Sequence, residues 1–293
     1  MVTDRRFAII GAGAVGRSLA AALRARGAQV VAVASRTLAS ARAGAALAGS
    51  PLAATDLAVA ARLANSVALC VPDDAIAAVC QSLAQAGGFE QGDVAFHVSG
   101  ALPSQVLAPA QACGANILSF HPAQTFAHAD ADAFRGAYCV IEGDEAGLAF
   151  GRELAALLGA IPVAIGAADK PLYHAALCLA CNYLVTLADL GAGLLCAAGL
   201  GDHSLPALQP LLRGAVENLA RSSPAEALTG PISRGDVATL RSHLRALAGA
   251  APALVPLYRS LGVHTLALAV RRGTLGEERA RAVRELLERS DGR

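Results

Sequence analysis

FAIIGAGAVG, at residues 7–16, is the stretch that decides the fold of the first half of this chain. A short apolar run leads directly into the spacing Gly-x-Gly-x-x-Gly, a helical pattern continues to about Arg26, and a second β-rich run follows at 29–34. Glycines at this spacing, between a strand and a helix, are typical of a βαβ unit that binds a dinucleotide. The first glycine permits a tight turn, the second lets a pyrophosphate approach the backbone, and the third lets helix and strand pack closely. The residues expected to hold the dinucleotide at the helix N-terminus are Gly11, Gly13, Ala14, Val15 and Gly16.

The end of the second run indicates which dinucleotide binds. A site selective for NAD usually places Asp or Glu there, where the carboxylate accepts a hydrogen bond from the ribose 2′-hydroxyl. This chain instead has Ser35, Arg36 and Thr37. A guanidinium flanked by two hydroxyls suits a 2′-phosphate dianion. We therefore expect NADP(H) rather than NAD(H), although Thr37 taken alone also fits an ordinary helix cap.

Residues 6–166 alternate β-rich runs with helical patterns such as Val15–Arg26, Asp74–Gln85 and Glu145–Leu158. This alternation predicts a Rossmann-type, mostly parallel sheet with helices on both faces. The predicted strands are Phe7–Ile10, Gln29–Ala34, Val67–Val71, Val94–Val98, Asn116–Phe120, Tyr138–Glu142 and Pro162–Ile165.

From Asp169 onward the β-rich runs disappear and helical patterns continue to the end of the chain. The helical part is interrupted at Gly199–Gly201, at 224–236 and at Gly273. We therefore predict an α/β fold in which an NADP-binding Rossmann domain, residues 1–167, precedes an all-α domain for substrate binding and dimerisation, residues 168–293.

Composition excludes several classes of partner. The formal net charge is +1 with both signs interspersed, which offers no attraction to nucleic acid or to an anionic membrane. The seven cysteines are odd in number and scattered, as in a reduced protein rather than a disulfide framework. The first residues lack the apolar run of a signal peptide. These features predict a cytoplasmic protein.

The chain is nonetheless unusually apolar, with a mean hydropathy of +0.48. Its most span-like helical run, Pro171–Ala188, carries His174, Asn182 and Tyr183, whereas a membrane span needs about 20 apolar residues with few polar interruptions. A helix that is apolar on most sides is more typical of a domain interior or a contact between subunits. We therefore expect no membrane contact and a homodimer formed through the helical domain.

Polar side chains follow several predicted strands, at the sheet edge where open α/β sheets bind their ligands. Val71 and Pro72 are expected to form the wall beside the adenine-side ribose and the nicotinamide. Ser99 and Gly100 offer a hydroxyl and a backbone amide to a substrate carboxylate, and His121 offers an imidazole. Strand-end Ser and His also commonly cap turns, and both interpretations stay open.

Lys170 is the only lysine of the chain, the other cationic side chains being arginine. Unlike a guanidinium, an amine can give up a proton and take it back. The order Asp169-Lys170-Pro171 is typical of an N-cap and a first helical turn, where the helix dipole and burial lower the pKa of an amine. We predict that Lys170 is catalytic and donates a proton, or a hydrogen bond, to a developing alkoxide.

His174 and Asn182 are predicted to orient substrate, because they follow Lys170 on one stripe of the helix at multiples of four residues. A core histidine and asparagine with satisfied hydrogen bonds are the alternative. Cys178, on the same stripe, forms a Cys-x-x-Cys with Cys181. This pair lies within the helix and has no second cysteine pair, so we expect no metal there.

Arg234 lies in a polar loop, LTGPISRGD, at residues 228–236. A guanidinium at this position binds a substrate carboxylate or, equally well, pairs with Asp236 at a helix start. The residue types leave both interpretations open.

The motifs resemble, in order and over nearly the whole chain, Rossmann-like oxidoreductases whose C-terminal domain is catalogued only as a domain of unknown function. The resemblance is carried by the glycine loop, Ser35-Arg36-Thr37 and the segments CVPDDAI at 70–76, HVSGA at 97–101, SFHPAQTF at 119–126, IEGD at 141–144, DKPLYHAALCLACNYLV at 169–185 and LTGPISRGD at 228–236. More distantly the chain is similar to β-hydroxyacid dehydrogenases, ketopantoate reductases and pyrroline-5-carboxylate reductases. In the first two groups a Lys-x-x-x-Asn pair handles the substrate carbonyl. Here Lys170 matches the lysine, but His174 stands at the asparagine position.

The resemblance implies an NADPH-dependent reductase of a small carbonyl compound with a carboxylate. Ketopantoate, a 2-keto acid, is the lead that the resemblance suggests. Two alternatives stay open: an imine reductase resembling pyrroline-5-carboxylate reductase, and a non-catalytic NADP(H)-binding sensor or scaffold. A sensor needs no titratable groups at its cleft, and Lys170 with His174 argues against that interpretation.

Overall fold

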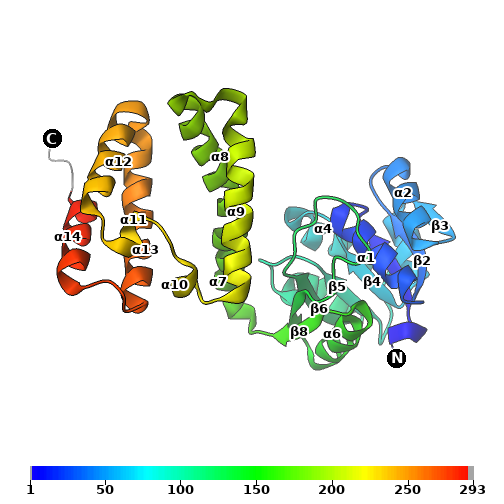
Figure 1. The fold of residues 1–293 in the computed structure, drawn as a ribbon. Coiled ribbons are helices and arrows are strands. Elements are labelled where there is room, and N and C mark those ends of the chain that lie inside the picture. The colour runs from blue at the N-terminus through cyan, green and yellow to red at the C-terminus, as the bar shows by residue number, and fades with distance from the viewer. Residues whose placement is uncertain (1, 290–293) are drawn as a thin grey trace. The chain divides into compact units, whose positions relative to one another are not determined.

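The structure is a computed structural model that describes residues 2–289. The chain divides into two compact units between Ala180 and Cys181. The first unit contains the β-sheet and helices α1 to α7, and the second contains helices α8 to α14 (Figure 1). The sequence placed the domain boundary after residue 167, where the strands end. Contacts instead group the helix that follows, α7 (Lys170–Leu177), with the sheet.

The first unit is built around an eight-stranded sheet with the order β3-β2-β1-β4-β5-β6-β7-β8. Neighbouring strands run parallel except β6 and β7, which are antiparallel. This confirms the predicted mostly parallel, Rossmann-type sheet. The strands are β1 (Arg6–Ile10), β2 (Gln29–Ala34), β3 (Leu52–Ala54), β4 (Ser66–Leu69), β5 (Val94–His97), β6 (Asn116–Pro122), β7 (Tyr138–Gly143) and β8 (Ile161–Ala164).

Helices cover both faces of this sheet, which is why its strands read as continuous apolar runs. In β1, Phe7 and Ile9 join the core under α1 and α6, whereas Ala8 and Ile10 join the core under α3 and α4. Successive side chains of a strand point to opposite faces, so every residue of FAII is buried. The helices of this unit, besides α7, are α1 (Ala14–Ala25), α2 (Leu38–Ala48), α3 (Leu57–Arg62), α4 (Asp73–Gln85), α5 (Ala108–Ala112) and α6 (Glu145–Leu158).

All seven predicted strands are present; Gln29–Ala34 has the predicted bounds, and the others differ by one or two residues at an end. The sequence missed β3, which consists only of Leu52, Ala53 and Ala54. Three residues without a β-branched side chain carry no recognisable strand pattern. They become a strand because they pair with the end of β2 at the edge of the sheet.

The described residues of the second unit form helices and their connections without any strand, as predicted. Figure 1 shows α8 beside α9, and α12 beside α13 and α14. The chain reverses between α8 and α9 where Gly199 and Gly201 adopt positive φ values of 100° and 52°, which confirms the predicted break. Gly273 has a φ of 75° after α13. The helices are α8 (Tyr183–Leu195), α9 (Ser204–Arg221), α10 (Pro224–Ala227), α11 (Pro231–Arg234), α12 (Val237–Ala250), α13 (Val255–Arg271) and α14 (Glu277–Glu288).

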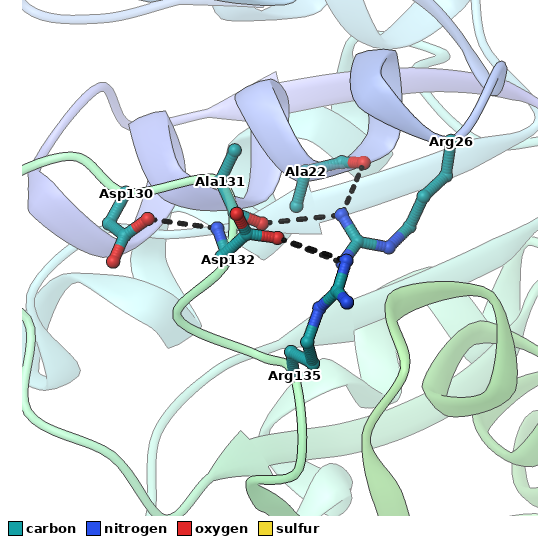
Figure 2. A network of polar contacts seen from close by, with 6 residues as sticks. All are labelled: Ala22, Arg26, Asp130, Ala131, Asp132 and Arg135. Atoms are coloured by element: carbon teal, nitrogen blue, oxygen red, sulfur yellow. Dashed lines mark hydrogen bonds and ion pairs between the residues drawn. The ribbon is translucent and has the colours of Figure 1, made fainter.

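The segment that joins β6 to β7 is anchored on α1 (Figure 2). The backbone N–H of Asp130 donates to Ser18 Oγ at 3.0 Å, and Arg26 donates to the carbonyl of Ala131 at 3.3 Å. Arg26 also lies 3.7 Å from Asp132, whose side chain is 71% exposed against 15% for Arg26. An exposed ion pair contributes little, so the segment is held mainly by the hydrogen bonds from Asp130 to Ser18 and from Arg26 to Ala131.

Candidate functional site

The glycine loop connects β1 to α1 and explains why three glycines stand there. Gly11 has a φ of 106°, and a Cβ on it would collide with the carbonyl of Cys70. A Cβ on Gly16 would collide with the carbonyl of Gly11, whereas a Cβ on Gly13 would meet nothing within 4 Å. The close packing of the loop therefore requires glycine at positions 11 and 16. Gly13 leaves space above the N-terminus of α1, whose N-cap residue it is.

A cavity of about 500 Å³ opens beside this loop. Six of the predicted cofactor residues line it: Gly11, Gly13, Ser35, Arg36, Val71 and Pro72. Arg36 makes no hydrogen bond or ion pair with any other described residue, so its guanidinium is available to an anion. Cys70 also lines the cavity, and burial raises the pKa of its thiol to about 12, which keeps the thiol neutral.

The remaining predicted cofactor residues do not line this cavity. Ala14, Val15 and Gly16 form the first turn of α1. Thr37 is the N-cap of α2, and its hydroxyl oxygen accepts from the backbone N–H of Ser40 at 3.2 Å. The helix-cap interpretation of Thr37 is therefore confirmed.

Ser99 connects the cofactor cavity to the end of β5. Its hydroxyl donates to Asp73 at 2.7 Å and accepts from the backbone N–H groups of Ala101 and Leu102 at 3.2 and 3.1 Å. Asp73 starts α4, directly after Pro72. The hydroxyl that the sequence offered to a substrate carboxylate is thus engaged with a carboxylate of the protein and with a turn.

Lys170 reaches back from the first residue of α7 into the sheet edge. Its amine donates to Ser119 Oγ at 2.7 Å and lies 3.4 Å from the carbonyl oxygen of Ser99. The side chain is 0% exposed. Burial lowers the pKa of the amine, and the negative charges of Glu142 and Asp73 partly oppose this shift.

The predicted N-cap before Lys170 needs a correction. Asp169 occupies the N-cap position of α7, but its side chain makes no capping hydrogen bond. A short 3-10 turn, Ala167–Asp169, precedes α7 and gives Asp169 helical dihedral angles. A residue in that conformation does not aim its carboxylate at the N–H groups of the next turn.

His97 is a fully buried histidine with both ring nitrogens engaged. The backbone N–H of Ser99 donates to Nδ1 at 3.1 Å, so the ring proton lies on Nε2, 3.2 Å from the carbonyl oxygen of Pro103. Burial lowers the pKa of His97 to about 4, and the charge of Lys170 acts in the same direction. The imidazole is neutral and holds the turn after β5.

His121 and His174 are partly buried, and both lie against the position where Gly100 lacks a side chain. A Cβ on Gly100 would lie 2.7 Å from His174 Cδ2 and 2.8 Å from His121 Nε2. The missing side chain lets both rings approach the end of β5, and their centroids are 6.2 Å apart. Burial lowers the pKa of His121 to about 4, with Lys170 and His174 contributing next.

Tyr173 belongs to this cluster, and the sequence interpretation gave it no role. Its phenol oxygen lies 2.7 Å from His121 Nδ1, and burial raises its pKa to about 12. Tyr173 is three residues after Lys170, so the helical repeat places both on one face of α7. That spacing is the signal that could have identified it.

Asn182 and Arg234 are placed differently from the residues above. Asn182 is exposed and ends a π-helical turn, Cys178–Asn182, that interrupts the predicted stripe. Arg234 is exposed in the second unit and lines a cavity of about 700 Å³. Asp236 instead caps α12, accepting from the backbone N–H of Thr239 at 3.0 Å. The structure thus brings together Ser99, Gly100, His121, Lys170 and His174, all in the first unit.

Comparison with known domain families agrees with this architecture. Residues 3–122 match a Rossmann-like domain, and residues 137–265 match a domain of unknown function, DUF2520. The two matches follow one another along the chain, in the order that the motifs indicate. The resemblance stated from the motifs is therefore confirmed. Among curated proteins, none matches this chain.

Solved structures with the same architecture include NADP-dependent oxidoreductases. A protein assigned as an NADP oxidoreductase from Bacteroides fragilis is 28% identical, with a TM-score of 0.74 over 90% of this chain and 99% of its own. Protein TM1727 from Thermotoga maritima is 25% identical, with a TM-score of 0.72 over 91% of this chain and 99% of its own. A reductive aminase from Aspergillus terreus, solved with NADPH and ethyl levulinate, is 22% identical, with a TM-score of 0.62 over 95% and 98%. The last likeness concerns the fold alone.

The neutral His97 makes stability depend on pH. Its folded pKa, about 4, lies below the ordinary value of 6.5, so the unfolded chain binds the proton first and stability is lost as the pH falls from about 6.5 to 4. We expect His97→Asn, which keeps an acceptor for Ser99, to be less stable at neutral pH. Its loss of unfolding free energy between neutral pH and pH 5 should be smaller than that of the wild type, by on the order of 1–2 kcal/mol. Chemical denaturation at both pH values measures this.

The matched control is His128→Asn, because His128 is an exposed histidine in the same unit. It should retain the pH dependence of the wild type. Equal pH dependence in His97→Asn and the wild type would show that His97 is not held neutral in the folded protein.

Proposed function

We propose that this chain is an NADPH-dependent reductase of a small carbonyl compound that bears a carboxylate, with 2-keto acids, ketopantoate among them, as the leading substrate class. One observation carries the proposal. The cavity at the glycine loop and the cluster of Lys170, His121 and His174 lie at the same edge of one sheet, linked by the hydrogen bond between Ser99 and Asp73. The oxidoreductase assignment of the similar Bacteroides protein supports the same reaction class.

The residues of the cavity fit NADP(H). The uncapped N-terminus of α1 and the open space at Gly13 suit a pyrophosphate. Arg36, with the hydroxyl of Ser35 beside it, suits the 2′-phosphate. When bound, NADPH supplies a hydride to the substrate carbon. The protein's own part is to orient the substrate and to manage the proton that the substrate oxygen takes up.

The choice of NADP(H) over NAD(H) is tested by Arg36→Gln. Losing a charge-assisted hydrogen bond to the 2′-phosphate costs about 1.5–3 kcal/mol, so we expect the Kd for NADPH to rise about 10- to 100-fold. The Kd for NADH should change little. Arg42→Gln removes an exposed arginine of the same helix region and is the control. Equal weakening of NADPH and NADH binding would contradict the assignment of Arg36.

Turnover is expected to depend on Lys170, whether the amine acts on the substrate directly or through its neighbours. Lys170→Met keeps a similar volume and removes a desolvated amine, so the protein should still fold. We expect at least a ~100-fold loss of turnover, the scale of general acid–base catalysis, with an unchanged Kd for NADPH. Thermal denaturation checks folding, and a fully active variant would contradict the role of Lys170.

The substrate class is tested by screening 2-keto acids and cyclic imines for oxidation of NADPH. The imine alternative is supported by the shared fold of the reductive aminase, and it predicts turnover of cyclic imines in preference to 2-keto acids. Tight NADPH binding without turnover of either class would instead favour the sensor or scaffold.

Asn182 and Arg234 are proposed to contact substrate. For each of them, an alanine variant with an unchanged KM would contradict this.

We also propose a homodimer formed through the second unit. Val185 in α8 and Leu211 and Val216 in α9 are 69%, 70% and 52% exposed. Two helical stretches, Ala167–Arg221 and Pro252–Arg271, are long and apolar enough to cross a membrane by length and composition alone. A second copy of the chain, which carries the same apolar helices, is the occupant we propose for this surface.

The dimer is tested by Leu211→Glu, which places a charge on the proposed contact. Light scattering should give twice the chain mass for the wild type and a single chain mass, or a mixture, for the variant. Arg213→Gln, an exposed change of charge in the same helix, is the control and should have the same solution mass as the wild type. A monomeric wild type, or one that partitions into lipid vesicles, would contradict the proposal.

A further inference from the structure

Lys170, Tyr173 and the three histidines at the ends of β5 and β6 differ in their access to solvent. Lys170 and His97 are 0% exposed. Lys170 is hydrogen-bonded to Ser119, and His97 has both ring nitrogens engaged. His121, Tyr173 and His174 are only partly buried. A group that transfers a proton must contact the atom that receives it, which restricts the direct donor to these three side chains.

Among the three, Tyr173 and His121 form a hydrogen-bonded pair. The phenol oxygen and Nδ1 are 2.7 Å apart, and the rings meet edge to face at 80°. Burial holds the pKa of Tyr173 at about 12 and that of His121 at about 4. At neutral pH the phenol is therefore protonated and the imidazole is uncharged. The pair holds a phenol proton beside an imidazole that carries one ring proton.

Gly100 fixes the orientation of His121 in this pair. Nε2 of His121 faces Gly100, where an added Cβ would come within 2.8 Å of it. Nδ1 is consequently the nitrogen that faces Tyr173. The ring of His174 lies against the same position, 2.7 Å from that added Cβ, so both rings occupy the space that a side chain at position 100 would take.

We propose that Tyr173 is the proton donor of the reaction, that His121 positions and stabilises it, and that Lys170 acts behind both as a positioning residue. This inference rests on the proposed reductase function. It goes beyond that function because it assigns the donated proton to Tyr173, for which the sequence motifs predicted no role.

The hydride of NADPH forms the new C–H bond at the carbonyl carbon, and the π electrons of the C=O bond move to the oxygen. That oxygen takes the phenol proton of Tyr173, and the O–H bond of the phenol breaks. The phenolate that remains accepts a hydrogen bond from Nδ1–H of His121. It recovers a proton from water, which reaches the partly exposed phenol.

Lys170 holds the framework of the pair. Its amine binds Ser119, two residues before His121 on β6, and lies near the carbonyl of Ser99, the residue before Gly100. Lys170 itself is three residues before Tyr173 on α7. One buried amine thus joins the three backbone segments that carry the phenol, the imidazole and the glycine between the two histidines.

The first test is Tyr173→Phe, assayed with NADPH and the best 2-keto acid of the screen. We expect kcat to fall at least ~100-fold while the Kd for NADPH stays within about twofold. Tyr138→Phe, a change at a 56% exposed tyrosine of the same unit, is the matched control and should keep the activity of the wild type. A cyclic imine that arrives already protonated needs no donor, so Tyr173→Phe should reduce it at nearly the wild-type rate.

Nitrogen NMR of the histidine rings tests the pair without any turnover. We expect the ring proton of His121 to lie on Nδ1. The chemical shift of this nitrogen should change in Tyr173→Phe. It should change in the same direction in Lys170→Met, since that variant loosens the framework. A merely structural lysine would leave this ring nitrogen unchanged.

Two results would overturn the inference. One is Tyr173→Phe with a kcat for 2-keto acids within threefold of the wild type while Lys170→Met is inactive. The other is a His121 ring protonated on Nε2 alone, which would make the imidazole an acceptor from the phenol. If no carbonyl or imine compound oxidises NADPH, the proposed function itself fails, and the NMR result still decides which partner of the pair donates.

Discussion

The hydrogen bond between the amine of Lys170 and the hydroxyl of Ser119 is the contact on which the candidate site depends. It joins the start of α7 to β6 at 2.7 Å between two residues that are both 0% exposed. A desolvated amine is costly unless its donors are satisfied. The strand ends that supply Ser119 and the carbonyl of Ser99 must therefore keep their positions, and the imidazoles and the phenol around them are held as a consequence.

The sheet makes this contact possible. Parallel strands end at a common edge, so β4, β5 and β6 bring the turn at Pro72, the turn at Gly100 and His121 together although they are far apart in sequence. Glycine at positions 11 and 16 lets the loop lie against Cys70, and glycine at position 100 lets two rings lie against β5. Cofactor cavity and polar cluster are thus produced by the same packing of backbone at one edge.

Much of this arrangement was predictable because its signals are local in sequence. The strand FAII, the glycine spacing and the absence of a carboxylate after β2 each lie within one βαβ unit. The role of Ser99 was not predictable, since it depends on Asp73, which is 26 residues away and binds its hydroxyl. The interruption of the predicted stripe before Asn182 was not predictable either. A strict four-residue step assumes an unbroken α-helix, and the π-helical turn Cys178–Asn182 changes the repeat.

The single lysine is explained by how an amine fits the surroundings of position 170, whereas its chemistry first suggests proton exchange. A guanidinium cannot lose its charge and needs partners for five N–H donors, whereas the space around Lys170 offers a hydroxyl and a carbonyl at hydrogen-bonding distance. An amine satisfies these two acceptors, and it does so without the further donors that a guanidinium would leave unpaired. An arginine-rich chain would keep a lysine at this position for its fit alone. The proton transfer that we propose then belongs to the partly buried side chains around the lysine.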